Sequence, residues 1–98
     1  MRLIKVVPAP PQSPKKYQAV FLLENGKQKI TGFGLKGYED YTMHKDRARR
    51  ERYRKRHEKD LRTNDPTRAG YLSYYLLWGD STQLRVNQKR FKQMFHLS

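Results

Sequence analysis

The chain has 98 residues, of which 36% are apolar and 32% are charged. This length suits one small domain with a thin core and leaves no room for two independent cores. The 22 lysines and arginines outnumber the 9 aspartates and glutamates and give a formal net charge of +13, which implies a polyanionic partner: nucleic acid, an acidic protein surface or anionic lipid. Cysteine is absent, which excludes disulfides, thiolate zinc sites and cysteine nucleophiles.

Neither membrane insertion nor secretion is indicated. The longest apolar run, residues 71–78, is far shorter than the roughly 20 residues that a membrane-spanning helix needs. Residues 1–8 lack the long apolar stretch and the small-residue cleavage site of a signal peptide. We therefore expect an intracellular protein without a transmembrane segment.

Residues 1–16 are expected to form an extended, proline-rich arm. Four apolar residues favour one short strand there: Leu3, Ile4, Val6 and Val7. Prolines at positions 8, 10, 11 and 14 then exclude a helix or sheet and favour polyproline geometry. Such a segment is either a disordered linker or a strap laid along a partner. The sequence leaves open whether its strand joins this molecule or a neighbour.

Residues 17–34 carry the signal of a β-hairpin, because Asn25-Gly26 lies between two strand-like runs and suits a two-residue type I′ turn. This turn predicts three cross-strand pairs: Leu23 with Gln28, Phe21 with Ile30, and Ala19 with Gly32. The buried face would then carry four residues: Tyr17, Ala19, Phe21 and Leu23. Lys27 and Lys29 would lie on the opposite face.

Residues 46–62 are predicted to form a basic helix with Asp46 as its N-cap. A narrow seam of residues one turn apart can rest on the core: Arg49 or Arg50, Tyr53, His57 and Leu61. The remaining circumference is cationic and incompletely paired with acids, which favours contact with a polyanion over simple solvation. The candidate partner-binding residues are Arg47, Arg49, Arg50, Arg52, Arg54, Lys55, Arg56, Lys59 and Arg62.

Two further helices are predicted, an aromatic one over 66–78 and a C-terminal one over 82–97. The aromatic stripe is interpreted as core volume, since the chain has few aliphatic residues, although exposed rings beside arginines also stack on bases. It comprises Tyr71, Tyr74, Tyr75 and Trp78. The C-terminal helix offers a second basic face: Arg85, Lys89, Arg90 and Lys92. Tyr38 and Tyr41 lie in the loop before the basic helix and could face a ligand. The expected fold class is α+β, with residues 17–98 as one domain.

Motifs for catalysis and for cofactor binding are absent from the sequence. The three histidines match no zinc-ligand spacing, and neither a phosphate-binding loop nor a nucleophile motif is present. We expect no enzyme activity, no cofactor, no metal and no small-molecule substrate. Base-reading motifs are missing as well, so binding of DNA or RNA would rest on the phosphate backbone. Charge alone leaves nucleic acid and an acidic protein surface equally open.

Several segments resemble a family of small basic proteins, a domain of unknown function, encoded by large nucleocytoplasmic DNA viruses of algae and protists. The matching segments are Val6-Val-Pro-x-Pro10 with Lys15-Lys-Tyr17, Gly37-Tyr-x-Asp-Tyr-Thr-x-His-Lys-Asp46, Arg50-x-x-Tyr-x-x-Arg-His57, Asp65-Pro-Thr-x-Ala-Gly70, Leu76-Leu-Trp-Gly79 and Phe91. The resemblance covers nearly the whole chain and departs from the usual pattern at Tyr74-Tyr75.

This resemblance implies a viral setting: the virion, and the host cytoplasm or virus factory during assembly. Small cationic proteins of such viruses commonly serve as minor capsid or cement proteins, or condense the genome. The expected function is therefore a virion structural protein whose partners are other virion proteins, such as the major capsid protein. The alternative is a protein that binds DNA or RNA without sequence specificity.

Overall fold

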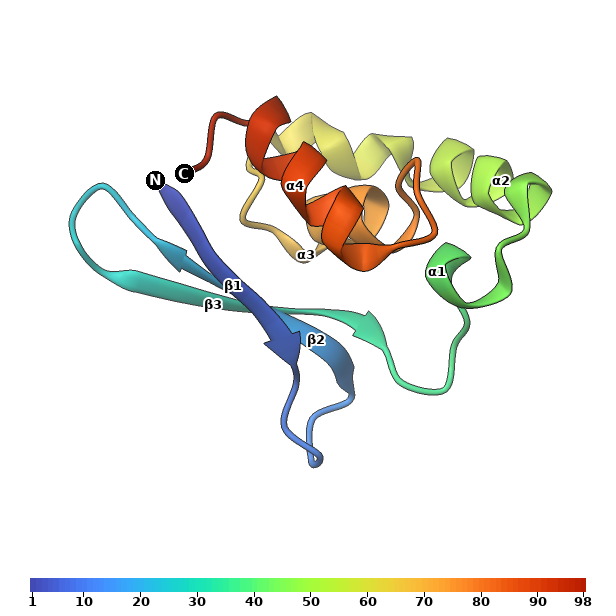
Figure 1. Ribbon diagram of the computed structural model, residues 1–98, viewed down its shortest axis with the longest axis horizontal. Helices are drawn as coiled ribbons and strands as arrows, with labels where there is room; N and C mark the ends of the chain where they lie inside the picture. Colours follow the sequence, from blue (N-terminus) through green and yellow to red (C-terminus); the bar gives the residue numbers. More distant parts are fainter.

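The computed structural model describes residues 1–98 and has a three-stranded sheet followed by helices (Figure 1). The strands are β1 (Arg2–Pro8), β2 (Lys15–Leu22) and β3 (Gln28–Leu35). The helices are α1 (Tyr41–His44), α2 (Arg47–His57), α3 (Ala69–Leu72) and α4 (Leu84–Met94), with a 3₁₀ segment η1 (Glu58–Thr63) after α2 and a π-helical segment η2 (Ser73–Leu77) after α3. The predicted α+β class is confirmed. None of the helices combines the length and the apolar composition that crossing a membrane requires.

The first strand belongs to the domain, which corrects the expectation of a separate arm over residues 1–16. The strand order is β1-β2-β3, and β1 pairs antiparallel with β2. Pro8 is the last residue of β1, and the other three prolines lie in the connection between the strands. Ser13 N donates to Pro10 O at 2.9 Å there, and Ala9 N donates to Lys16 O at 3.0 Å. Leu3 is 1% exposed and lies in the core. The apolar block before the prolines is therefore a core strand rather than a strap.

The β2–β3 hairpin forms where it was predicted, but its register is one residue different. Phe21 pairs with Lys29 and Val20 with Ile30, because the loop has three residues, ends at Gly26 with φ 81°, and is closed by Leu23 N donating to Lys27 O at 2.8 Å. A residue of positive φ at the third loop position is typical of such loops.

The different register exchanges the two faces of β3. Ile30, predicted opposite Phe21 on the buried face, is 59% exposed, whereas Lys29 lies on the inner side and donates from Nζ to Thr67 Oγ1 at 2.7 Å. The placement of Lys29 on the outer face was therefore wrong. The buried face of β2 is as predicted, since Ala19 and Phe21 are fully buried and Tyr17 and Leu23 pack against the core.

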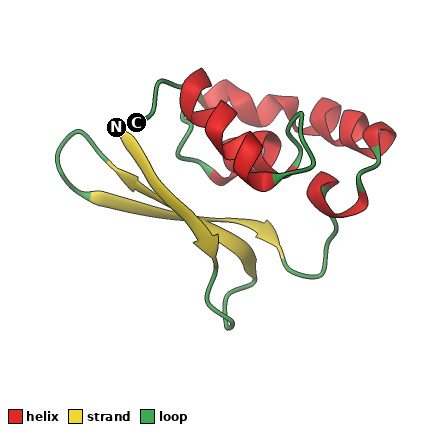
Figure 2. Cartoon of the chain, in the orientation of Figure 1, coloured by secondary structure: helices red, strands yellow, loops and turns green.

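One core lies between the sheet and the helices. Phe21 and Phe33 of the sheet pack with Leu72, Leu76 and Phe91 of the helical half, and the helices cover only one face of the sheet (Figure 2). The other face is not covered by helices (Figure 2) and carries the exposed Ile30. Helix α2 lies on the covered side, so its position depends on this core.

The aromatic helix begins later than predicted and contains a wider turn. Asp65 accepts from Thr67 N at 3.0 Å and closes a turn, so α3 begins only at Ala69. In η2, Trp78 N donates to Ser73 O at 3.0 Å, five residues back. Tyr71, Tyr74 and Trp78 are at most 9% exposed, which confirms their interpretation as core.

Local capping explains where α1 and α2 begin. Asp46 is the predicted N-cap of α2, and its carboxylate accepts from the N–H groups of Ala48 and Arg49. These bonds lower the pKa of Asp46 from its usual value. The short α1 was not predicted; it begins after Asp40, which accepts from Thr42 N at 2.9 Å. The basic helix ends at His57 rather than at residue 62, and α4 is shorter than predicted.

Candidate polyanion-binding site

The inner seam of α2 is an aromatic stack. Tyr53 lies parallel to Trp78, with ring centroids 4.2 Å apart, and His57 stacks on Tyr53 at 4.1 Å. His57 Nδ1 is hydrogen-bonded to Asp60 Oδ2 at 3.0 Å, which ties α2 to η1. Burial raises the pKa of Tyr53 to about 12. The predicted seam is confirmed, and it fixes which side of α2 faces outward.

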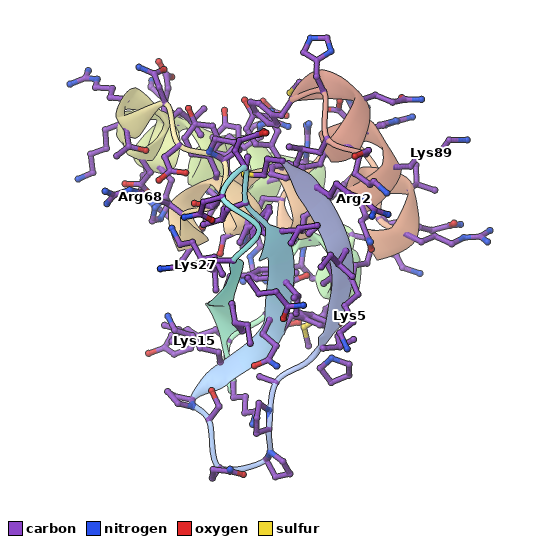
Figure 3. All side chains as sticks on the ribbon, turned by 90° about the vertical axis from the view of Figure 1, so that its left-hand side faces the viewer. Arg2, Lys5, Lys15, Lys27, Arg68 and Lys89 are labelled. Carbon is purple, nitrogen blue, oxygen red and sulfur yellow. The ribbon has the colours of Figure 1, made fainter.

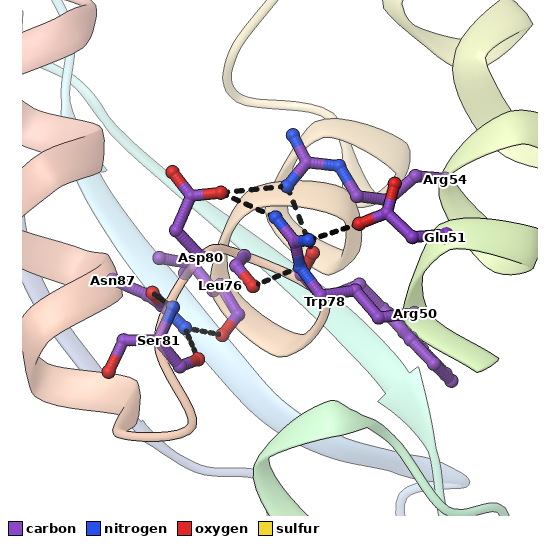
Figure 4. A network of polar contacts seen from close by, with 9 residues as sticks. Arg50, Glu51, Arg54, Leu76, Trp78, Asp80, Ser81 and Asn87 are labelled. Carbon is purple, nitrogen blue, oxygen red and sulfur yellow. Dashed lines mark hydrogen bonds and ion pairs between the residues drawn. The ribbon is translucent and has the colours of Figure 1, made fainter. Parts of the chain in front are cut away.

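Two of the predicted partner-binding arginines turn inward instead (Figure 4). Arg50 is 8% exposed; its Nε donates to Gly79 O at 2.7 Å, and its terminal nitrogens pair with Glu51 and Asp80. Arg54 lies 4.5 Å above the Tyr74 ring and 3.3 Å from Asp80. The assignment of Arg50 as a partner-binding residue was wrong, because its charge and hydrogen bonds are used within the monomer.

The loop that receives these arginines is held by one buried amide. Asn87 is 2% exposed; its Nδ2 donates to Leu76 O at 3.0 Å and to Ser81 O at 2.7 Å, and its Oδ1 accepts from Ser81 N at 2.9 Å (Figure 4). At Gly79 a Cβ would lie 2.2 Å from Tyr75 O, so only glycine fits there. This packing presents Gly79 O to Arg50.

The other cations of α2 and η1 remain largely unpaired. Arg49 is 3.6 Å from Glu39, and both side chains are about half exposed, so this pair contributes little. Six cations are exposed and have no carboxylate within ion-pair distance: Arg47, Arg52, Lys55, Arg56, Lys59 and Arg62. We call these six residues the free cations. They are the part of the predicted site that the structure leaves available to a partner.

A cleft of about 640 Å³ opens beside α2, between the ends of β2 and β3, the loop before α1, and α3. Five cationic side chains line it, against three carboxylates: Lys15, Lys16, Arg49, Arg52 and Arg56, and Glu39, Asp40 and Asp60. Tyr53, His57, Ser73 and Trp78 complete the deep wall on the helical side. Figure 1 shows that these elements meet on one side of the molecule, at the end of β3.

Sequence reasoning missed the contribution of β2 to this cleft. Lys16 is largely buried, and its Nζ donates to the buried Asp40 at 2.7 Å. Lys15 lines the cleft next to it. Nothing near these residues in the sequence indicates their role. They come close to α2 only because β3, α1 and the loop between them lead the chain back beside β2.

The two candidate tyrosines differ. Tyr38 is 69% exposed and lines the cleft, as its prediction requires. Tyr41 is 7% exposed and lies 5.6 Å from the Arg50 guanidinium. Its assignment as a partner-facing residue was wrong, because it starts α1 and packs in the core.

The second basic face divides into two parts. Arg85, Lys89 and Lys92 border a shallow depression on α4, whereas Arg90 lies on the side of Arg54. Lys92 is partly buried and the other three are exposed. No group of three acidic or histidine side chains is arranged to hold a metal ion.

Comparison with known proteins gives one match. The model of a family of unknown function, DUF5754, matches residues 5–57, more than half of the chain. The chain therefore belongs to this family. The matched segment covers nearly all of the sheet, α1 and α2, and so includes four of the free cations and most of the cleft. No curated protein matches the chain, and no solved structure does.

Proposed function

We propose that this protein is a non-enzymatic structural protein of a virion that contacts polyanionic or acidic partner surfaces through the free cations. The observation that carries the proposal is the absence of any carboxylate partner for these six exposed side chains. Like charges along one helix repel each other and cost stability unless a partner offsets them. A negatively charged partner completes this surface.

The rigidity of α2 supports a binding role. The stack of Tyr53 on Trp78 and the bonds of Arg50 hold the helix against the core. The backbone positions of the four free cations on α2 are therefore fixed before a partner arrives, which reduces the entropy lost on binding. Only their side chains need to become ordered.

The viral setting rests on the sequence resemblance alone. The proposed location is the virion, and the host cytoplasm or virus factory during assembly. Its partners would be other virion proteins, such as the major capsid protein. Since β1 is a core strand, residues 1–16 are not free to act as a strap between subunits, and the free cations alone carry the proposal.

Quantitative mass spectrometry of purified virions, before and after removal of the genome, tests the proposal. We expect a constant copy number per particle that survives genome removal. Absence of the protein from purified particles would overturn the proposal. A variant in which the six free cations are changed to glutamine should be incorporated at a much lower copy number than the wild type.

A second candidate function is sequence-nonspecific binding of DNA or RNA. Cationic residues also lie on the side away from α2: Arg2, Lys5, Lys27, Arg68 and Lys89 (Figure 3). Positive charge on opposite sides of a body of 40 × 30 × 23 Å allows contact with two nucleic-acid segments at once. In this case nuclease treatment of opened particles would release the protein, and log affinity would fall with log salt by roughly 0.9 for each phosphate neutralised. Retention after nuclease treatment together with no binding to DNA at low salt would exclude it.

A further inference from the structure

We propose that the cleft binds one nucleotide unit of a single-stranded nucleic acid, with the phosphate on Arg52 and Arg56 and the base on Tyr38. This inference rests on the second candidate function and assigns it a specific site. The free cations outside the cleft could contact any polyanion, whereas the cleft would select a nucleotide by its shape and its side chains. Three features of the cleft support it.

The first feature is the placement of arginines on α2. Positions 49, 52 and 56 lie within one flank of a helix of 3.6 residues per turn, and all three side chains line the cleft. Arg47 and Lys55 do not line it. An arginine presents a planar fork of donors that matches two phosphate oxygens, whereas a lysine presents a point charge. The cleft flank is therefore the one suited to phosphate.

The second feature is the position of Tyr38. It is the one exposed ring among the chain's seven tyrosines, four phenylalanines and one tryptophan, because the others are buried or half-buried. An exposed aromatic ring beside a cationic groove is the platform on which bases of single strands stack.

The third feature is the mixture of charges within a limited volume. About 640 Å³ is within the range of sites for small molecules, so one or two nucleotides fit and a duplex does not. Glu39 at the cleft is 57% exposed and makes a single long ion pair, with Arg49. Its carboxylate can accept an N–H group of a base. An exposed ring for stacking, arginines for the phosphate and an acceptor for the base together favour a nucleotide as the occupant.

Titration of the full-length protein with a fluorescein-labelled oligothymidylate, and with a duplex of the same length, tests the proposal. Fluorescence anisotropy gives affinity, and emission of the single tryptophan, Trp78, reports on the cleft that it lines. We expect the single strand to change Trp78 emission and to bind more tightly than the duplex. Tyr38→Ala should weaken single-strand binding about tenfold.

Matched double variants separate the cleft from overall charge. Arg52→Gln with Arg56→Gln and the control Arg47→Gln with Lys55→Gln each remove two exposed charges from α2. The cleft variant should bind the single strand at least tenfold more weakly and show a flatter salt dependence, by about 0.7 in slope for each phosphate that it no longer neutralises. In the control, the affinity for the single strand should decrease by no more than about threefold.

The failures of the two proposals differ. Equal decreases in affinity in the two double variants, or an unchanged affinity in Tyr38→Ala together with unchanged Trp78 emission, would overturn the cleft site while nucleic-acid binding itself stands. No binding of either oligonucleotide at low salt would overturn both. Circular dichroism of each variant confirms that a decrease in affinity does not reflect unfolding.

Discussion

Arg50 and Arg54 lie one turn apart on α2, and both turn toward the loop after η2 rather than toward solvent. In the sequence they are indistinguishable from the arginines around them. Their role is set by Asn87, which holds the loop so that Gly79 O faces α2. A basic helix can therefore contain both structural and partner-binding arginines, which differ in the tertiary contacts that each side chain finds.

Replacing Arg50 tests this division. Arg50→Leu leaves the carbonyl oxygen of the buried Gly79 without its donor, which costs about 2 kcal/mol of unfolding free energy. Arg52→Leu, two residues away and exposed, should change it by less than about 0.5 kcal/mol. Urea denaturation of the two variants measures both values. Similar decreases in both would show that Arg50 has no structural role.

The acid–base behaviour of Tyr53 gives a second prediction. Burial raises the pKa of this phenol to about 12, so the folded protein holds the proton more tightly than the unfolded chain, whose tyrosines titrate near pH 10. This contribution to stability is fully present below about pH 10 and is lost as the pH rises through about 12. In Tyr53→Phe, unfolding free energy should therefore fall less steeply above pH 10 than in the wild type. Parallel pH profiles of the two proteins would contradict the prediction.

At the scale of the element, β1 and the prolines after it have the sequence of a flexible tail, yet β1 pairs with β2 in the sheet. Leu3 is 1% exposed, and its neighbour Ile4 is 42% exposed at an irregularity in the β1–β2 pairing. Leu3→Ala should cost about 3 kcal/mol of unfolding free energy, as core truncations of leucine do. Ile4→Ala should cost less than about 1 kcal/mol. Chemical denaturation distinguishes these values, and a negligible decrease in Leu3→Ala would restore the arm interpretation.

The elements that sequence patterns predicted correctly depend on local chemistry. The Asp46 cap, the Tyr53–His57 seam and the buried face of β2 follow from capping and periodicity within a few residues. The register of the hairpin was wrong because Asn25-Gly26 suits both a two-residue and a three-residue loop. The backbone at Gly26 adopts the second.

The candidate site was predicted in part. The arginines of α2 could be identified from charge, but the cleft could not, because it needs Lys15 and Lys16 from β2 and Glu39 and Asp40 from the loop before α1. These segments are brought together by sheet topology, which depends on residues distant in the sequence. The burial of Arg50 and Tyr41 was missed for the same reason.

At the scale of the whole molecule, a net charge of +13 is confined to a body of 40 × 30 × 23 Å. Salt screens the repulsion between these charges, and the screening length is roughly 10 Å at 0.1 M salt. At lower ionic strength the repulsion reaches farther. Raising sodium chloride from about 0.02 to about 0.2 M should therefore raise the melting temperature, by about 4 °C, equivalent to about 1 kcal/mol in a domain of this size.

A variant with the six free cations changed to glutamine is the control for this effect. Its melting temperature should respond to salt less than that of the wild type, because less repulsion remains to be screened. Calorimetry of both proteins at matched salt concentrations measures the difference. An identical salt response would show that the free cations do not destabilise the isolated monomer.

The five-residue hydrogen bond of η2 has a consequence for how the chain tolerates length changes. It absorbs one residue more than a regular α-helix would, directly before Trp78. Deleting a single residue there would let the segment become a regular α-helix while the residues after it keep their direction, because the wide turn already absorbs that residue. The indole would then stay on Tyr53, and Gly79 O would still face Arg50. A deletion in the regular turns of α2 would instead rotate all that follows by about 100°, so η2 should tolerate the loss of one residue better than α2 does.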